Sequence, residues 1–561
     1  MRPNFSRSIA DAAAGTRAWV AYGVAETLFV AALRFWRCLS EARPAPICGV
    51  AGDLTLPLLA LIAYALIGAL LGLIAGRRFV AITVIGAFLI NAVMHGSRSI
   101  VLLLGFAIAI LVLQWKARVL AAFAVVAIML TVIPTPAPRS STRVSSSRPN
   151  VILITLDTVR ADHLSLYGYG RDTTPHLRQW PATVYRNAFS SSNWTLPGHA
   201  SIFTGQSVSR HGAHESAESD FHPIATSSVT LPQLLSRQGY VTAGIVANYG
   251  NLSGPAGFER GFAYYDYVYP HGLGDPSTPS YLLRATLRNQ FATIYALAPA
   301  SEVNERATRF LKSTKSPFFL FLNYMDAHVP YGGSGAFAWD TYFDLAKRGR
   351  PLAPQQSQQL ISLYDGAIHD LDEQLHQLFE TLKRLNLYDN TLIVVTSDHG
   401  EAFGESPIVG HGRSLFQHQI HVPLIVKNPH ANQRAFVDTP VSDVDILPLI
   451  LGRPIPSDRW ITSESYRRRD PRIAHGENRP AEIALIRGSM KVIVDTRGSI
   501  ELYDLAADPQ ERVNLHGREP MPEGWEAALA ACIAEANSQS PTPAVNDPEI
   551  LRRLRALGYL H

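Results

Sequence analysis

The sequence predicts an N-terminal α-helical membrane bundle, followed by an α/β domain with a central, mostly parallel sheet and a small C-terminal subdomain. Two observations lead to this fold class. Only 17% of the 561 residues are charged (DEKR) and 47% are hydrophobic, with the most apolar segments near the N-terminus, whereas soluble domains average about 25% charged residues. Beyond residue 149, short apolar runs alternate with amphipathic stretches, which is typical of strands and helices in an α/β fold.

Residues 1–134 predict a transmembrane domain of about five helices. Each apolar segment approaches the roughly 20 residues that cross the hydrocarbon layer of a bilayer. The first segment contains Glu26, so it is either a span with one buried acid or a helix lying in the membrane interface, and we favour the span. We place the helices at residues 18–36, 54–76, 79–96, 99–115 and 119–135.

Basic residues between the spans predict the orientation of the chain. With five spans, the richer set of basic residues falls on one side, which the positive-inside rule places in the cytoplasm. This set comprises Arg2, Arg7, Arg17, Arg77, Arg78, Lys116 and Arg118. An odd number of spans then places everything after them on the periplasmic or extracellular side. We therefore expect an integral, multi-pass protein of the inner or plasma membrane, with the lipid bilayer as a partner.

The rest of the chain divides into three predicted parts. Residues 135–149 are rich in Pro and Ser and show no apolar period, so they predict an extended linker. Residues 150–455 predict the α/β domain, and residues 456–561 the C-terminal subdomain and tail. The net charge of +4 comes from basic residues scattered among acidic ones, so we expect no nucleic acid partner.

Carboxylates and imidazoles follow three of the predicted strands. The carboxyl ends of parallel strands meet at one edge of a sheet, where α/β proteins bind ligands. An Asp after a strand is often only a helix cap, but three such strands together favour a site. Mixed oxygen and nitrogen ligands suit a divalent metal ion, Zn or Mn rather than Mg or Ca. The strands are residues 150–156, followed by Asp157; 318–324, followed by Asp326 and His328; and 391–397, with Asp398 and His399.

A hydroxyl group precedes a predicted helix in the segment SSNWTLPGHASIFTG, residues 191–205. Pro197 is suited to the first turn of a helix, which places Thr195 where backbone amides and the helix dipole favour an anion. A hydroxyl becomes a competent nucleophile when a nearby divalent cation eases the loss of its proton. Taken alone, Thr195 is better explained as a capping residue.

These motifs resemble the sulfatase branch of the alkaline phosphatase superfamily, from residue 150 to about residue 515. LDTVRADHLSLYGY resembles the first metal-ligand motif and TLPGHASIFTG the nucleophile motif. NYMDAHVPY and SDHGEAFGE resemble the substrate-binding and second metal motifs, and ELYDLAADPQERVNL resembles the C-terminal subdomain. The resemblance implies a sulfatase-like α/β fold and a metal-dependent enzyme that acts on ester bonds.

Carried over residue by residue, the resemblance implies a metal ion held by Asp157, Thr195, Asp398 and His399, with Thr195 also the nucleophile that forms a covalent ester. The resemblance also places His199 among the catalytic residues. Three further residues match positions that bind the substrate or a second metal ion, and Asp326 is either a ligand or a partner of His328. They are His328, Asp326 and His411, the last lying twelve positions after His399. Arg160 and Asp162 are expected to form a structural ion pair.

The nucleophile motif departs from the CxPxR pattern of sulfatases, because Thr195 replaces the cysteine and His199 the arginine. Threonine cannot be converted to formylglycine, so we expect none. A Thr nucleophile, an Asp-His pair and an N-terminal set of spans also resemble phosphoethanolamine transferases and lipoteichoic acid synthases, which are membrane-anchored phosphotransferases.

We therefore expect a membrane-anchored metalloenzyme that cleaves or transfers a phosphate or sulfate ester group through an ester on Thr195, with a phospho-substrate favoured. Two alternatives stay open. One is a sulfuric ester hydrolase acting on an envelope or extracellular sulfate ester. The other is a membrane protein that binds an anionic ligand without catalysis. The ester is expected to be anionic and to belong to a lipid or a glycan.

Overall fold

The computed structural model describes residues 148–215, 221–268, 297–314, 317–331, 352–405, 408–466, 482–495 and 498–538. All of them belong to one compact unit. The predicted transmembrane helices, and the linker up to residue 147, lie outside these residues. Within the described ranges, no helix combines the length and the apolar character that crossing a bilayer requires. The N-terminal membrane bundle therefore stays a prediction.

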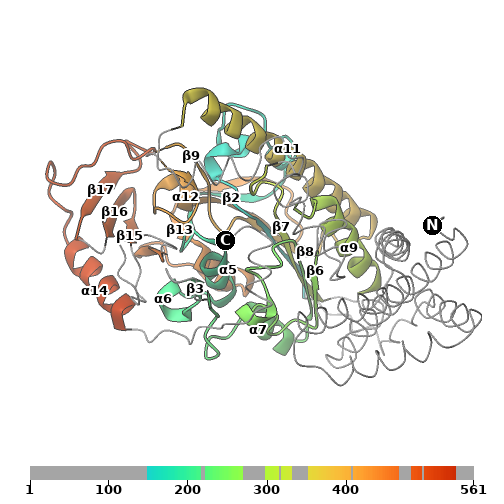
Figure 1. Cartoon of the computed structure of the whole chain (residues 1–561). Helices are drawn as coiled ribbons and strands as arrows, with labels where there is room; N and C mark the ends of the chain where they lie inside the picture. The colour runs from blue at the N-terminus through green and yellow to red at the C-terminus, as the bar shows by residue number, and fades with distance from the viewer. Residues whose placement is uncertain are drawn as a thin grey trace, which may run out of the picture. The chain divides into compact units, whose positions relative to one another are not determined.

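In the described part of the chain, nine strands form the central sheet, in the order β12-β2-β11-β8-β1-β7-β5-β6, with β13 beside β2 (Figure 1). Only β11 runs antiparallel to its neighbours, β2 and β8, so the predicted mostly parallel sheet is confirmed. The strands are β1 (Asn150–Leu156), β2 (Thr183–Phe189), β5 (Val241–Val246), β6 (Tyr264–Tyr267), β7 (Phe318–Tyr324), β8 (Thr391–Thr396), β11 (His421–Lys427), β12 (Ala435–Val437) and β13 (Val441–Ser442).

The strands β1, β7 and β8 lie next to one another and are buried along their whole length. Their continuous apolar runs suit a position with both sheet faces covered. Ile154 is in register with Leu322 of β7 and with Val395 of β8. The three strands therefore end at the same edge of the sheet, and the residues that follow them meet there.

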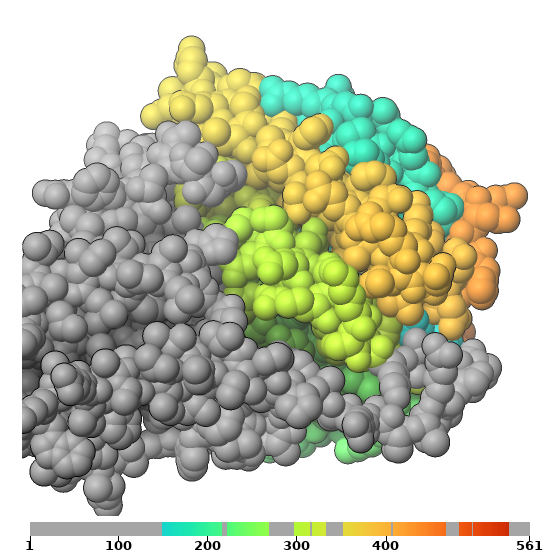
Figure 2. Space-filling view, turned by 90° about the vertical axis from the view of Figure 1, so that its right-hand side faces the viewer, coloured from blue at the N-terminus to red at the C-terminus, as the bar shows by residue number. Residues whose placement is uncertain are grey.

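Helices cover both faces of this sheet, with α9 (Ala300–Ser313) and α11 (Pro354–Arg384) on one side and α5 (Thr195–Thr204) on the other (Figure 1). Figure 2 shows α9 and α11 side by side on the molecular surface. Leucines at helical spacing, including Leu371, Leu375 and Leu382, are the buried side of α11. The shorter helices are α6 (Val208–His211), α7 (Leu231–Arg237), α12 (Gln417–Ile420) and α13 (Ile446–Ile450).

A second, antiparallel sheet of four strands lies in the predicted C-terminal subdomain: β14 (Ile461–Ser465), β15 (Glu482–Arg487), β16 (Met490–Asp495) and β17 (Ile500–Asp504). Successive side chains point to opposite faces. Ala484 and Ile486 pack with Phe189 and Leu415 of the main domain. Ile483 and Leu485 pack against α14 (Trp525–Ser538). This sheet therefore shares one core with the α/β domain and a second core with α14.

Candidate functional site

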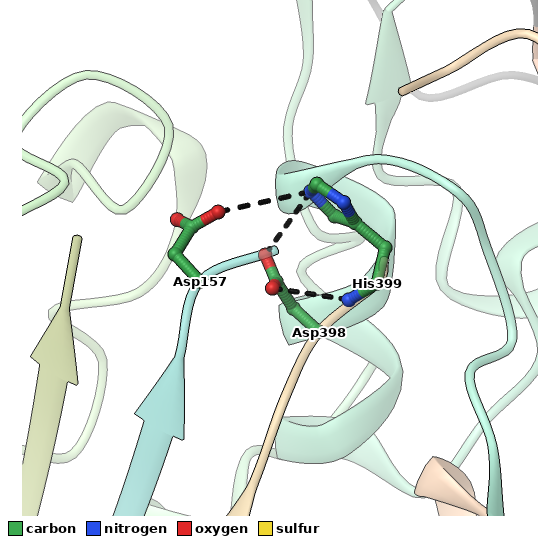
Figure 3. Close-up of side chains that lie close together, drawn as sticks. All are labelled: Asp157, Asp398 and His399. Atoms are coloured by element: carbon green, nitrogen blue, oxygen red, sulfur yellow. Dashed lines mark hydrogen bonds and ion pairs between the residues drawn. The ribbon is translucent and has the colours of Figure 1, made fainter. Parts of the chain in front are cut away.

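Three of the predicted ligands meet at the carboxyl edge of the central sheet (Figure 3). Asp157 follows β1, and Asp398 and His399 follow β8. One ligand atom of each lies within 4.8 Å of the others, and all three side chains are buried. Nε2 of His399 is 3.8 Å from Oδ1 of Asp157 and 3.4 Å from Oδ2 of Asp398. Strand register alone thus brings residues more than 240 positions apart in the chain to one point.

Each of the two carboxylates has one oxygen that accepts hydrogen bonds of good geometry and one that accepts none. Oδ2 of Asp157 accepts a hydrogen bond from Nδ2 of Asn248 at 3.0 Å. Oδ1 of Asp398 accepts from the amides of Thr158 and His399 at 3.3 and 3.0 Å. The other oxygens, Oδ1 of Asp157 and Oδ2 of Asp398, are buried and accept no hydrogen bond of good geometry. A buried carboxylate oxygen without such a partner is costly, and a bound cation satisfies it.

The ring of His399 is oriented to act as a ligand. Nδ1 donates to the carbonyl of Gly400 at 2.9 Å, which leaves the lone pair of Nε2 directed at the two carboxylates. Burial lowers the pKa of His399 to about 4, although Asp398 opposes the effect. The imidazole is therefore neutral at physiological pH, as metal coordination requires.

The two carboxylates differ in pKa. Burial raises the pKa of Asp157 well above its ordinary value, and the charge of Asp398 adds to the effect. Burial also acts to raise the pKa of Asp398, but His399 and His199 outweigh it and hold this pKa below its ordinary value. A divalent cation between the two residues would favour the ionised form of both. The donor set and its two unbonded oxygens thus fit a divalent metal ion.

Thr158 forms an unusual turn after Asp157. Its φ of +65° is uncommon for a β-branched residue. This turn directs the amide of Thr158 at Oδ1 of Asp398. Its Oγ1 lies 2.7 Å from the carbonyl oxygen of Asp157 and 2.9 Å from that of Ala327, so the side chain ties the loops after β1 and β7 together. The strained conformation is therefore part of the ligand geometry.

Thr195 is the first residue of α5, after Trp194 in extended conformation. We predicted it just ahead of the helix, and the structure places it one position inside, with Pro197 still in the first turn. Its Oγ1 lies 3.2 Å from Nε2 of His399. The amides at this helix end have no partner within the helix, so they favour an anion beside the hydroxyl.

Gly198 allows the close approach of α5 to the ligand loop. A Cβ at this position would lie 2.5 Å from the carbonyl oxygen of Asp398, a distance that no real side chain tolerates. The helix that carries Thr195 therefore packs directly on the backbone of Asp398. This contact fixes the separation between the predicted nucleophile and the predicted ligands.

His199 lies one turn after Thr195 and is fully buried. Nδ1 is 2.9 Å from the carbonyl oxygen of Thr195 and 3.2 Å from Oδ2 of Asp398. Nε2 is 2.9 Å from Oγ1 of Thr155. Both ring nitrogens thus face protein atoms, and the ring supports Thr195 and Asp398 from behind.

The other two histidines lie beside this group. The ring centre of His411 is 4.5 Å from that of His399 and 5.2 Å from that of His328. Nδ1 of His411 is 3.2 Å from Oε2 of Glu401, and Nδ1 of His328 is 2.8 Å from the carbonyl oxygen of Val329. Burial lowers the pKa of His328 to about 3 and that of His411 to about 4. Both rings are thus neutral and near the predicted metal ligands.

Asp326 takes a different position from these histidines. Its Oδ1 accepts a hydrogen bond at 3.0 Å from the amide of Ala300, the first residue of α9. Burial raises the pKa of Asp326 to about 6. The residue thus caps a helix, which is the alternative that an Asp after a strand always carries. The expected ion pair of Arg160 and Asp162 is confirmed, with two bonds of 2.9 and 2.7 Å.

Four residues at the site were not singled out from the sequence. Asn248, Asn323 and Thr155 lie at the ends of β5, β7 and β1, and Glu401 follows β8. Their signal was the one that identified Asp157, a polar residue at the carboxyl end of an apolar strand. Glu401 is a carboxylate, but it lies five positions after the end of β8, and the amides and hydroxyl of the other three are frequent in any loop.

Comparisons with known proteins identify the family of the chain. A family model described as "Sulfatase" matches residues 149–453. N-acetylgalactosamine-6-O-sulfatase of Bacteroides thetaiotaomicron is 24% identical over 67% of this chain and 91% of its own length. Choline-sulfatase of Rhizobium meliloti is 25% identical, with coverages of 66% and 83%.

Solved structures share the fold. A protein in complex with its substrate D-glucosamine-2-N,6-O-disulfate superimposes with a TM-score of 0.52 and 16% identity, covering 70% of this chain and 99% of that one. A 2-O GAG sulfatase gives a TM-score of 0.51 and 16% identity, with coverages of 72% and 96%. At this level of identity the likeness speaks for the fold alone.

Proposed function

The chain belongs to the sulfatase family of metal-dependent, ester-cleaving hydrolases, and from this premise we propose that it cleaves or transfers a phosphate ester group through a covalent ester on Thr195. The observation that carries the proposal is the position of Oγ1 of Thr195, 3.2 Å from Nε2 of His399. The two unbonded carboxylate oxygens of Asp157 and Asp398 lie beside the same nitrogen. The proposed nucleophile and the proposed metal ligands thus lie at one buried point.

The residues that would hold a divalent metal ion, Zn or Mn, are Asp157, Thr195, Asp398 and His399. When bound, such an ion would lower the pKa of the Thr195 hydroxyl and neutralise charge on the ester oxygens. The amides of Thr195 and Leu196, the first two residues of α5, would donate to the same oxygens. We propose that His328 and His411 contact the anionic group of the substrate, and a second metal ion is the alternative ligand for them.

In the proposed reaction, Oγ1 of Thr195 attacks the phosphorus in line, the bond to the leaving alcohol breaks, and the hydroxyl proton leaves with solvent or the alcohol. Water then attacks the phosphorus of the Thr195 ester in a hydrolase, or an acceptor hydroxyl does so in a transferase. His199 would keep Thr195 in place during both steps through its contact with the Thr195 carbonyl oxygen.

Phosphate is favoured over sulfate because of the nucleophile. Threonine cannot become formylglycine, so a sulfate ester on Thr195 has no geminal hydroxyl through which to eliminate and would need direct attack by water. Sulfate is the second candidate, because relatives of the chain are named as sulfatases. The substrate of either kind would be an anionic ester of a lipid or a glycan.

We further propose that the enzyme is anchored in a membrane by the predicted spans in residues 1–134, with its catalytic domain on the periplasmic or extracellular side. The apolar composition of that segment and the distribution of its basic residues support this placement. Its function would then be exerted on the outer side of the membrane. Protease protection of the C-terminal domain in sealed inside-out vesicles tests the orientation.

The activity is tested with four esters, p-nitrophenyl phosphate, a phosphodiester analogue, p-nitrophenyl sulfate and a phosphoethanolamine lipid, given to the Zn- or Mn-loaded full-length chain. We expect turnover of a phospho-ester that is lost in Thr195→Ala. Turnover of the sulfate alone would replace phosphate by sulfate. Full activity of Thr195→Ala with any ester would exclude the covalent route.

A further inference from the structure

Four buried residues connect the two predicted metal carboxylates beneath the site. Nδ2 of Asn248 donates to Oδ2 of Asp157 at 3.0 Å, and the backbone N–H of Asn248 donates to Oδ1 of Asn323 at 2.8 Å. Nδ2 of Asn323 lies 3.3 Å from Oγ1 of Thr155. Thr155 in turn contacts Nε2 of His199 at 2.9 Å. We call Asn248, Asn323, Thr155 and His199 the buried network, and all four are fully buried.

The buried network has a defined direction of hydrogen bonding. The backbone amide of Asn248 can only donate, so it fixes Oδ1 of Asn323 as the acceptor and turns Nδ2 toward Thr155. Oγ1 of Thr155 then accepts from Asn323, and its own proton can be donated to Nε2 of His199. The carbonyl oxygen of Thr195 can only accept, so a proton sits on Nδ1 of His199 and points at that oxygen. The hydroxyl of Thr155 on one side of the ring and the carbonyl oxygen of Thr195 on the other thus fit the same tautomer of His199, with its proton on Nδ1.

Nδ1 of His199 is the point where the nucleophile and a ligand are joined. It lies 2.9 Å from the carbonyl oxygen of Thr195 and 3.2 Å from Oδ2 of Asp398. A proton on Nδ1 attracts both oxygens, whereas the other tautomer would present a lone pair to them. The tautomer of His199 therefore decides whether the first turn of α5 and the side chain of Asp398 are held together.

We propose that Thr155 and Asn323 are positioning residues, which fix His199 as its Nδ1–H tautomer and thereby hold Thr195 and Asp398 at the spacing that metal binding requires. The proposal rests on the proposed function, in which Thr195 and Asp398 are metal ligands. It gives Thr155, a strand residue two positions before Asp157, a role beyond packing. Partners of this kind behind a metal ligand typically contribute about 10- to 100-fold in metal affinity.

The test compares Thr155→Val with Thr155→Ser in the purified full-length chain. Valine has the shape of threonine without its hydroxyl, and serine keeps the hydroxyl. Zn2+ affinity is measured by competition with a chromophoric chelator, without substrate. We expect Thr155→Val to bind Zn2+ about 10- to 100-fold more weakly than the wild type, and Thr155→Ser to stay within about 3-fold.

Thr242→Val is the matched control, because Thr242 is equally buried in the same sheet and donates to the carbonyl oxygen of Gly261 at 2.7 Å. It loses a buried hydrogen bond but should keep its Zn2+ affinity. Equal affinities of Thr155→Val and Thr242→Val would overturn the proposal, as would equal losses in Thr155→Val and Thr155→Ser.

Asn323→Leu is the second variant. It tests the proposal if Thr155→Val does not fold, that is, if Thr155→Val shows no cooperative thermal unfolding in EDTA. Asn323→Leu breaks the buried network one residue earlier, so its Zn2+ affinity should fall by a similar factor, and an unchanged affinity would contradict the proposal. Because no substrate is present, the affinities are independent of the covalent chemistry. A wild type that binds Zn2+ but forms no ester on Thr195 would refute the proposed function and leave this inference standing.

Discussion

Oγ1 of Thr195 lies 3.2 Å from Nε2 of His399, although 204 positions separate the two residues in the chain. The contact joins the first residue of α5 to the loop after β8. Nδ1 of His399 is already occupied by the carbonyl of Gly400, so Nε2 is the atom available to a metal ion. A hydroxyl and an imidazole lone pair thus face the same buried point, together with two carboxylate oxygens that accept no hydrogen bond of good geometry. This arrangement is the basis of the proposed chemistry.

Asp398→Asn should abolish tight metal binding. The substitution removes a negative charge and replaces Oδ2, the oxygen 3.4 Å from Nε2 of His399, by an amide nitrogen that cannot bind a cation. We expect the affinity for Zn2+ or Mn2+ to fall by at least about 100-fold, so that the variant loses its metal ion during dialysis. Activity should fall with the metal content. Metal content is measured by mass spectrometry of the eluted metals. Asp389→Asn, at an exposed position before β8, is the control and should retain its metal. Normal metal content in Asp398→Asn would remove Asp398 from the ligand set.

Gly198→Ala should displace α5 from the ligand loop. The added Cβ would lie 2.5 Å from the carbonyl oxygen of Asp398, so the backbone of one of the two segments must move. We expect activity to fall by more than about 10-fold, because even a small displacement of a reacting group from its working position slows the reaction. Steady-state rates and thermal unfolding check the result.

Gly366→Ala is the control for this substitution. Gly366 lies within α11, and a Cβ there would meet nothing within 4 Å. Alanine should therefore stabilise the helix by about 0.5–1 kcal/mol and leave the rate unchanged. Equal activities of the two glycine variants would show that the close approach at Gly198 is not needed for catalysis.

Glu464→Gln should stabilise the protein at alkaline pH. Glu464 accepts hydrogen bonds from the amide and the hydroxyl of Ser209, and burial raises its pKa from 4.5 to about 7. Below pH 4.5 both the folded and the unfolded states are protonated, so the carboxyl adds no penalty. Between pH 4.5 and about 7 only the unfolded state releases the proton, so stability falls as pH rises. Glutamine removes this loss, which amounts to about 3 kcal/mol at most.

The measurement is the difference in free energy of unfolding between Glu464→Gln and the wild type, taken at several pH values. We expect the difference to grow from pH 5 to pH 8 and then to level off. A difference that is the same at both ends of this range would show that Glu464 titrates normally in the folded state.

The sequence predicted the elements whose signal is local. Asp157, Asp398 and His399 follow continuous apolar runs, and such runs specify buried parallel strands whose ends coincide. The family resemblance drawn from the same motifs is confirmed, and so is the mostly parallel sheet.

The network behind the ligands could not be predicted in this way. Thr155, Asn323 and Asn248 meet because β1, β7 and β5 are neighbours in register, Thr155 with Asn323 and Asn323 with Val246. Nothing in the local pattern of any strand encodes that pairing. Asp326 has the local pattern of a ligand, shortly after an apolar strand. In the structure its carboxylate instead accepts a hydrogen bond from the first amide of α9.

The most direct test of the account is the mass of Thr195 after brief reaction of the metal-loaded, full-length enzyme with each ester, followed by peptide mapping. We predict an added phospho-group on the peptide that contains Thr195, at a mass that identifies the group carried. The adduct should be absent from Thr195→Ala. Turnover of a phospho-ester with no adduct on Thr195, even after rapid acid quenching, would contradict the covalent mechanism.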